Sequence, residues 1–192
     1  IKECDWSSDV CSSDLGDAVR TRQEITKAMN EYYEIHGFTT QTAIGRKGIP
    51  LPMPVIQGSN ITECVQMAQW LSNHFKACCI PRVLVETLGT RTEITQIVSN
   101  MGLHIHLLGF SEDILDDVTC ARMPGVMGID SAVPVRAGLK ELFLSLDMPV
   151  NPGKRGDYWE RDYNQGIIPW DMVEINLARF RRWITIENKT DW

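Results

Sequence analysis

A repeat of short β-rich segments is the feature that most limits what this chain can fold into. Four such segments alternate with helical patterns: "MPVIQ" (53–57), "RVLVE" (82–86), "HIHLL" (104–108) and "VMGID" (126–130). They recur at intervals of 22 to 29 residues. This spacing is typical of β–α units, in which parallel strands are joined by right-handed crossovers. The sequence therefore predicts an α/β fold built on a parallel sheet.

The segments between the expected strands have the apolar periodicity of helices. Four helices are expected: residues 17–36, 61–75, 90–101 and 112–121. The first ends at Gly37, a suitable C-terminal cap. Asn60 is a good N-cap for the second, and Glu63 stands at the position of its capping-box partner.

Two architectures share this spacing, half of a (β/α)8 barrel and a doubly wound sheet. A doubly wound sheet usually carries a GxGxxG phosphate motif at its first strand–helix turn. No strand–helix junction of this sequence has that motif. We therefore expect a partial (β/α)8 TIM barrel.

The first fifteen residues look foreign to the rest of the chain. "DWSSDVCSSDL" (5–15) matches the translation of a sequencing-library adapter, and such segments are excluded from fold reasoning. We expect the natural sequence to start at Gly16 without its true N-terminus, and residues 16–192 to form a single domain. Residues 1–15 carry −3 of the total net charge of −6, so −3 remains on the rest. This mildly acidic balance argues against a protein that coats nucleic acid, but it allows a local basic face.

Four cysteines remain in the natural part of the chain: Cys64, Cys78, Cys79 and Cys120. They form no CxxC motif and no Cys/His pair at zinc-ligand spacing, so we predict reduced, mostly buried thiols in a cytoplasmic protein. The chain also lacks a run of about 18 apolar residues that could cross a bilayer, and we expect no membrane partner.

The carboxyl ends of barrel strands are where reacting groups lie. The residues at these ends are the candidates for a site: Gln57, Glu86, Gly109 and Asp130. Polar residues mark the end of many strands, but in a barrel these would all meet at one end. His104 and His106 alternate on one strand and share a face. Since no third ligand stands at a suitable spacing, we interpret them as core or hydrogen-bonded histidines rather than metal ligands.

The order of three motifs, "PVIQG", "LHIHLLGFSEDILDDV" and "GIDSAVPVRAG", resembles the tRNA-guanine transglycosylase family, which includes the queuine and archaeosine tRNA-ribosyltransferases and their DNA-modifying relatives. The resemblance covers residues 53 to 138. When "DSAVPVR" is aligned with the family's D-C-V-L-P-T-R, Asp130 falls on the nucleophilic aspartate, Pro134 on the proline and Arg136 on the arginine. Gln57 falls on the glutamine that contacts the bound base.

The sequence departs from the family pattern in two places. The motif G-G-L-A-V-G-E reads "PRVLVETLG", which keeps an acid at Glu86 but loses the paired glycines. Members that act on tRNA bind zinc through C-x-C-x-x-C and a later histidine, and no cysteine or histidine follows Asp130. We therefore expect no metal and no other cofactor, as in a divergent branch similar to DNA-guanine transglycosylases. The family's acid/base aspartate, in D-S-G-G, would precede Gly16, so residues 16–192 alone are expected to be inactive.

The resemblance implies an enzyme that exchanges guanine in DNA or tRNA for a 7-deazaguanine base. Asp130 would attack the anomeric carbon to form a covalent glycosyl-enzyme, which the incoming base reopens. Arg136 would keep this carboxylate ionised or hold a phosphate or ribose. Gln57 and Glu86 would bind the edge of the base. Gly58 and Gly109 complete the expected substrate-binding set: they follow the first and third strands.

A polynucleotide substrate requires a flipped or single-stranded base and cations for the backbone. Candidate cations gather in the C-terminal part: Lys140, Lys154, Arg155, Arg161, Arg179, Arg181 and Arg182. Two alternatives stay open. One is another TIM-barrel carboxylate enzyme, such as a glycosidase or lyase. The other is a non-catalytic paralogue that binds nucleic acid or a partner subunit in a dimer.

Overall fold

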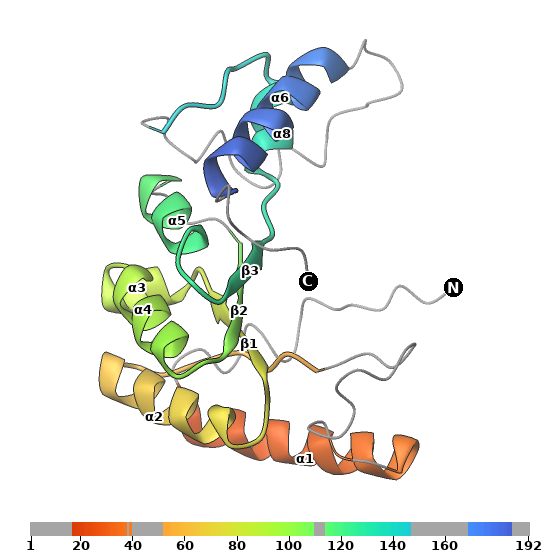
Figure 1. Cartoon of the computed structure of the whole chain (residues 1–192), viewed down its shortest axis with the longest axis vertical. Coiled ribbons are helices and arrows are strands. Elements are labelled where there is room, and N and C mark those ends of the chain that lie inside the picture. The colour runs from red at the N-terminus through yellow and green to blue at the C-terminus, as the bar shows by residue number, and fades with distance from the viewer. Residues whose placement is uncertain (1–16, 38, 40–51, 110–113, 147–168, 186–192) are drawn as a thin grey trace.

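The computed structural model describes residues 17–37, 39, 52–109, 114–146 and 169–185 (Figure 1). Helices and strands alternate through most of this range. Their order is α1 (Ala18–His36), α2 (Ile61–Ser72), β1 (Ala77–Pro81), α3 (Leu84–Leu88), α4 (Thr92–Asn100), β2 (His104–Leu108), α5 (Ile114–Ala121), β3 (Val126–Ile129), α6 (Val133–Leu139) and α8 (Trp170–Ile184).

The centre of the molecule is a parallel sheet with the strand order β1-β2-β3. An isolated parallel bridge from Val55 to Cys79 extends it by one more segment at the outer edge of β1. The sequence order of the strands is thus also their spatial order. This confirms the expected α/β fold, while the described strands form an open sheet and do not close into a barrel.

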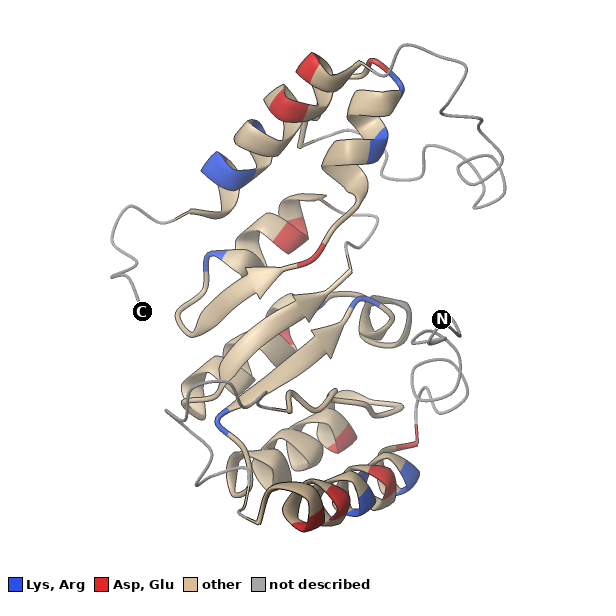
Figure 2. Cartoon of the chain, turned by 90° about the vertical axis from the view of Figure 1, so that its right-hand side faces the viewer, with Lys and Arg blue, Asp and Glu red and all other residues tan. Residues whose placement is uncertain are grey.

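Helices α2 to α5 cover one face of this sheet (Figure 1). Burial in β2 alternates accordingly: Ile105 and Leu107 are completely buried on the helix side, while His104 and His106 are half-buried on the other. The core under the helices includes Met67 of α2 along with residues of α4 and α5. Figure 2 looks onto the opposite face, where the strands lie in front of these helices. Among the described helices, α2 to α5 leave this face of the sheet uncovered.

The N-terminus of α2 is capped as its sequence predicts. The side chain of Asn60 accepts a hydrogen bond from the backbone N–H of Glu63 (3.0 Å). Glu63 in turn accepts hydrogen bonds from the backbone N–H (2.9 Å) and hydroxyl (2.8 Å) of Ser59. Both hydrogen bonds from Ser59 lower the pKa of the Glu63 carboxyl below its ordinary value, and the one from the backbone N–H has the larger effect. Helix α2 therefore starts at a fixed point directly after the segment that carries Gln57.

We expect Asn60→Ala to lower the free energy of unfolding by about 1 kcal/mol, because it removes the acceptor for an orphan N–H in the first turn. Urea denaturation measures the change. The matched control is Gln66→Ala, which truncates an exposed side chain on the same helix and should leave stability nearly unchanged. Equal stability of the Asn60→Ala variant and the wild type would contradict the capping role.

The second strand lies five residues before its expected position, so the prediction of a strand at 82–86 is wrong. Strand β1 occupies Ala77–Pro81, and the segment "LVETL" forms the short helix α3. Connections from a helix to the next strand usually take 2 to 6 residues, and α2 ends at Ser72. Gly89 then closes α3 in the left-handed conformation (φ 80°), with its N–H bonded to the carbonyl of Val85. Glu86 consequently lies in a helix and not at the end of a strand.

The first expected strand is also shorter than predicted, since residues 53–57 contribute only the bridge at Val55.

At the far end of the molecule, α6 and α8 pack against each other beyond β3 (Figure 1). A Cβ atom at Gly138 would lie 2.6 Å from the Cα of Val173, so only glycine permits this approach of the two helices. The buried side chain of Asn176 ties the following segment to α8, accepting from the N–H of Leu144 (2.9 Å) and donating to the carbonyl of Leu142 (2.8 Å).

Candidate functional site

The carboxyl-terminal edge of the sheet carries the candidate site. The strand register aligns one residue of each segment in a row across the sheet: Val55, Cys79, His106 and Gly128. Two residues further along the chain stand Gln57 on the first segment and Asp130 after β3. Both therefore reach the same edge, as expected from their positions at strand ends.

Asp130 lies at this edge with its side chain 60% exposed. Its Oδ1 accepts a hydrogen bond from the backbone N–H of Gly109 (2.9 Å) and lies 3.5 Å from Nε2 of His106. Its own N–H donates to the carbonyl of Leu107 (3.2 Å), which extends the pairing of β2 and β3 by one residue. Within the described part of the chain both side-chain contacts go to Oδ1 and none to Oδ2. The described contacts therefore orient the carboxylate through one of its two oxygens.

His106 is the side chain that the structure places beside the carboxylate of Asp130. Its side chain is 32% exposed and belongs to the sheet face that α2 to α5 do not cover. A Cβ atom at Gly128 would lie 3.3 Å from Nδ1 of His106, so the glycine leaves room for the imidazole. Arg136, for which we expected the place beside the carboxylate, is a half-buried residue of α6. The sequence interpretation of His106 as a hydrogen-bonded histidine missed its contact with the candidate nucleophile.

Gln57 and Gly58 lie at the other end of the same edge. Gln57 is 3% exposed, and its Oε1 accepts a hydrogen bond from the hydroxyl of Thr21 on α1 (3.0 Å). Two strands separate it from Asp130, roughly 14 Å along the sheet at the usual spacing of strands. A Cβ atom at Gly58 would lie 2.8 Å from the backbone nitrogen of Cys64, so this glycine allows close packing on α2. The structure thus joins Asp130 to Gly109 but not to Gln57.

A cavity of about 290 Å³ lies between α1 and the segment that ends at Gln57. Its lining includes Thr21, Ile25, Val55 and Gln57. Its volume is near the lower end of the range of ligand pockets, about 300–1,000 Å³. Gln57 thus lines this cavity and also lies at the edge of the sheet.

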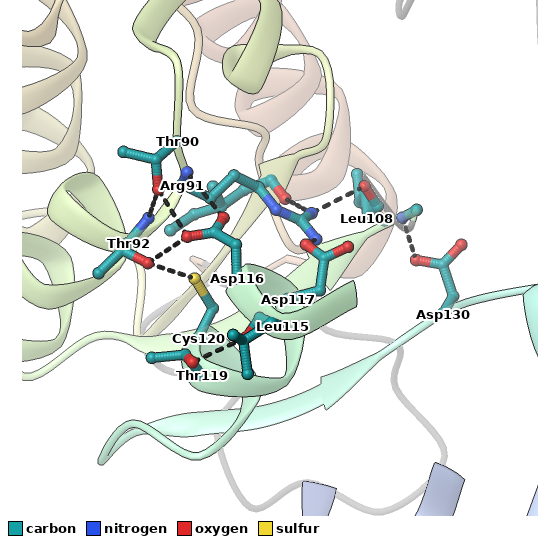
Figure 3. A network of polar contacts seen from close by, with 12 residues as sticks. Thr90, Arg91, Thr92, Leu108, Leu115, Asp116, Asp117, Thr119, Cys120 and Asp130 are labelled. Atoms are coloured by element: carbon teal, nitrogen blue, oxygen red, sulfur yellow. Dashed lines mark hydrogen bonds and ion pairs between the residues drawn. The ribbon is translucent and has the colours of Figure 1, made fainter. Parts of the chain in front are cut away.

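A buried polar network lies directly behind the site (Figure 3). Arg91 and Asp117 are both completely buried and form an ion pair. Nη1 of Arg91 also donates to two backbone carbonyls, those of Ile80 (3.4 Å) and Leu108 (3.3 Å). These residues belong to the carboxyl-terminal halves of β1 and β2. Sequence analysis did not identify this network.

Asp116 fixes the start of α4 beside this ion pair. Its carboxylate accepts hydrogen bonds from the hydroxyls of Thr90 (2.6 Å) and Thr92 (2.5 Å) and from the backbone N–H of Arg91 (3.3 Å). Helix α5 therefore contributes two adjacent carboxylates, one for the backbone and one for the guanidinium of Arg91. Together they hold Arg91 from two sides.

The four cysteines are free and buried, as predicted. Cys120 lies at the edge of the buried network, with its sulfur 3.5 Å from the hydroxyl oxygen of Thr92. Burial raises the pKa of Cys64 to about 11 and that of Cys78 to about 12, and it also raises the pKa of Cys120. These three thiols stay protonated near neutral pH and are poor nucleophiles.

The described residues contain no group of three or more His, Cys, Asp and Glu side chains arranged to hold a metal ion. None of the described helices is long and apolar enough to cross a membrane.

The expected phosphate contacts fall in two places. Lys154, Arg155 and Arg161 lie outside the described residues. Arg179 lies on α8 with its guanidinium 5.9 Å from the ring centroid of Trp183 and 6.0 Å from that of Phe143. This cation is thus held between aromatic side chains at the surface.

Comparisons of the chain with protein-family models, curated proteins and solved structures find no match. The chemistry of the site follows from its own groups. A largely exposed carboxylate with one oxygen in contact with an N–H and an imidazole can act as a nucleophile or a base.

Proposed function

We propose that this chain is part of a (β/α)8-barrel enzyme that exchanges guanine in a polynucleotide for a 7-deazaguanine base, with Asp130 as the covalent nucleophile. One observation carries the proposal. The carboxylate of Asp130 is exposed at the carboxyl edge of a parallel sheet, where Gly109 and His106 contact Oδ1 and no other described residue makes a hydrogen bond or ion pair to Oδ2. The position of α2 to α5 on a single face supports a half-barrel, since a doubly wound sheet has helices on both faces.

The reaction needs two displacements at C1′ of the sugar. Oδ2 of Asp130 attacks C1′, the bond from C1′ to N9 of guanine breaks, and its electron pair leaves with the base, which takes a proton from an acid. A ring nitrogen of the incoming base then attacks C1′, loses its proton to the same group, and releases the carboxylate. The N–H of Gly109 keeps the carboxylate in one orientation through both steps.

His106 serves this reaction as the partner of the nucleophile and not as the acid/base group. In retaining glycosidases the nucleophile and the acid/base carboxyl are about 5–5.5 Å apart, which leaves space for the bond that breaks between them. Nε2 of His106 is only 3.5 Å from Oδ1 of Asp130. The proton donor must therefore be a residue other than His106.

Recognition of the base and of the backbone falls to groups around the edge. Because Oε1 of Gln57 already accepts from Thr21, the amide of Gln57 would bind a purine through its N–H donors. The basic residues of α8, including Arg179, are candidates for phosphate contacts. A base must leave its stack to reach Asp130, so single-stranded or flippable sites are the expected substrates.

Incorporation of radiolabelled guanine tests this function, because the covalent intermediate can be reopened by the same base that left. The full-length gene product is incubated with labelled guanine and either single-stranded DNA or tRNA, and the label in the precipitated polynucleotide is counted. We expect label in one of the two, which also identifies the substrate. A protein that binds polynucleotide but leaves both unlabelled would be the non-catalytic paralogue, and the proposal would be wrong.

Removing the imidazole should slow formation of the glycosyl-enzyme. We expect His106→Leu to reduce the single-turnover rate by about tenfold or more, because a charge-assisted contact to the nucleophile is lost. His106→Gln keeps an N–H donor near the position of Nε2 and should retain more activity. Rapid acid quenching followed by intact-protein mass spectrometry gives the rate. A His106→Leu variant as fast as the wild type would show that the contact is irrelevant to the reaction.

A further inference from the structure

We propose that Arg91 positions Asp130 without touching it, by holding the peptide group that joins Leu108 to Gly109. The inference rests on the proposed role of Asp130 as nucleophile. It adds a buried residue, Arg91, to those that position this carboxylate. The residues involved are drawn in Figure 3, where Arg91 and Asp130 lie on opposite sides of Leu108.

Both ends of this one peptide group are hydrogen-bonded. Its carbonyl oxygen accepts from Nη1 of Arg91 (3.3 Å) and from the backbone N–H of Arg82 (2.8 Å). Its N–H, which belongs to Gly109, donates to Oδ1 of Asp130 (2.9 Å). A peptide group is planar and rigid, so turning the carbonyl away from Arg91 also turns the N–H away from Asp130. The guanidinium and the N–H of Arg82 therefore together set the direction of the N–H that the carboxylate accepts.

The guanidinium is itself fixed. Arg91 is completely buried, Asp117 pairs with its Nη2, and Nη1 also donates to the carbonyl of Ile80 on β1 (3.4 Å). Its planar fork lets one side chain serve a carboxylate and two carbonyls at once, which the single ammonium of a lysine cannot do in the same geometry. Arg91 thus ties the ends of β1 and β2 together behind the site.

The charge of Arg91 acts in the same direction as its geometry. A cation at the carbonyl end polarises the peptide, which strengthens the hydrogen bond that its N–H gives to an anion. In the buried surroundings of Arg91 this effect is screened less than it would be in water. Buried ion pairs can often be replaced by apolar residues without loss of stability. Stability alone therefore does not explain a buried arginine at this place, whereas a role in holding the nucleophile does.

The test removes the ion pair while keeping the core filled. In the double variant Arg91→Met/Asp117→Leu neither charge is left buried alone, so the protein should fold. The first readout is the amide resonance of Gly109 in a ¹⁵N–¹H spectrum. In the wild-type background we expect this resonance to shift when Asp130 is changed to Asn, because its N–H donates to that side chain, and in the double variant we expect that response to disappear. The second readout is the single-turnover rate, expected to fall about tenfold with little change in KM.

Arg91→Lys is the second variant, since it keeps a cation for Asp117 but not the fork that reaches Leu108. It should show the same loss of the Gly109 response, and it decides the question if the double variant does not fold. A folded variant with the wild-type Gly109 response and the wild-type rate would overturn the inference. The amide readout needs no catalysis, so it tests Arg91 even if Asp130→Asn leaves exchange intact and the proposed function fails.

Discussion

Replacing Arg91 alone with methionine is expected to lower the free energy of unfolding by about 3–5 kcal/mol. The arginine and Asp117 are both completely buried, so the single substitution removes the cation that compensates a carboxylate in the interior. It also leaves the carbonyls of Ile80 and Leu108 without the donor that now serves both. Loss of a buried charge partner is among the most destabilising single changes known.

Chemical denaturation of three variants separates the causes of this loss. Adding Asp117→Leu to Arg91→Met should restore most of the lost stability, because no charge then remains buried without its partner. Arg182→Met, which removes an exposed arginine of α8, should change stability by less than about 0.5 kcal/mol. If Arg91→Met is no more destabilising than Arg182→Met, the buried ion pair does not exist in solution.

Asp130→Asn is expected to lower the rate of base exchange by about 10³-fold or more, a loss of the size found when an enzyme loses its nucleophile. The amide oxygen can still accept the hydrogen bond from Gly109, so the edge of the sheet should keep its structure. The amide is neutral and cannot form the ester with C1′ that the carboxylate forms. Incorporation of labelled guanine measures the effect, with an unchanged urea midpoint as evidence of folding.

Glu174→Gln provides the matched control, since it neutralises an exposed acid on α8 in the same way. This variant should exchange guanine at the wild-type rate. An Asp130→Asn variant that keeps more than about a tenth of the activity would exclude a covalent role for this residue, because a nucleophile cannot be removed at so small a loss.

Local sequence signals predict the elements whose patterns are strong. The alternation of His104–Leu108 predicts β2 with its observed bounds, and the cap at Asn60 correctly predicts the start of α2. Gly37 likewise ends α1 as expected, in the left-handed conformation (φ 70°). In each case a period or a capping residue within a few positions determines the element.

Strand β1 was not predicted because no local sequence pattern identifies it. "ACCIP" is a five-residue apolar run without alternation, and such runs cannot be assigned from periodicity alone. "RVLVE" contains more β-branched residues, but pairing with β2 starts at Ala77 opposite His104. Tertiary pairing and the short connection from α2 therefore decide the strand, and Glu86 moves into a helix.

The candidate site likewise combines residues that local patterns predict with contacts that only tertiary packing determines. Asp130 and Gly109 could be predicted because both follow strands, but the contact of His106 with Asp130 depends on the pairing of β2 with β3. One clue to the buried network was available. Asp117 falls on the apolar face of α5, between Ile114 and Ala121, and an acid in that position requires a buried partner. That the partner is an arginine 26 residues earlier follows only from the packing of α4 against α5.

The most direct measurement of the central claim is the location of the covalent sugar. Acid-quenched full-length enzyme, stopped during exchange on its polynucleotide, is digested with nuclease and trypsin, and the peptides are mapped by mass spectrometry. Cleavage after Arg122 and Arg136 gives the peptide "MPGVMGIDSAVPVR", in which Asp130 is the only carboxylate side chain. The account predicts a glycosyl adduct on this peptide and none in Asp130→Asn. An adduct on a different peptide, or one that persists in the variant, would contradict it.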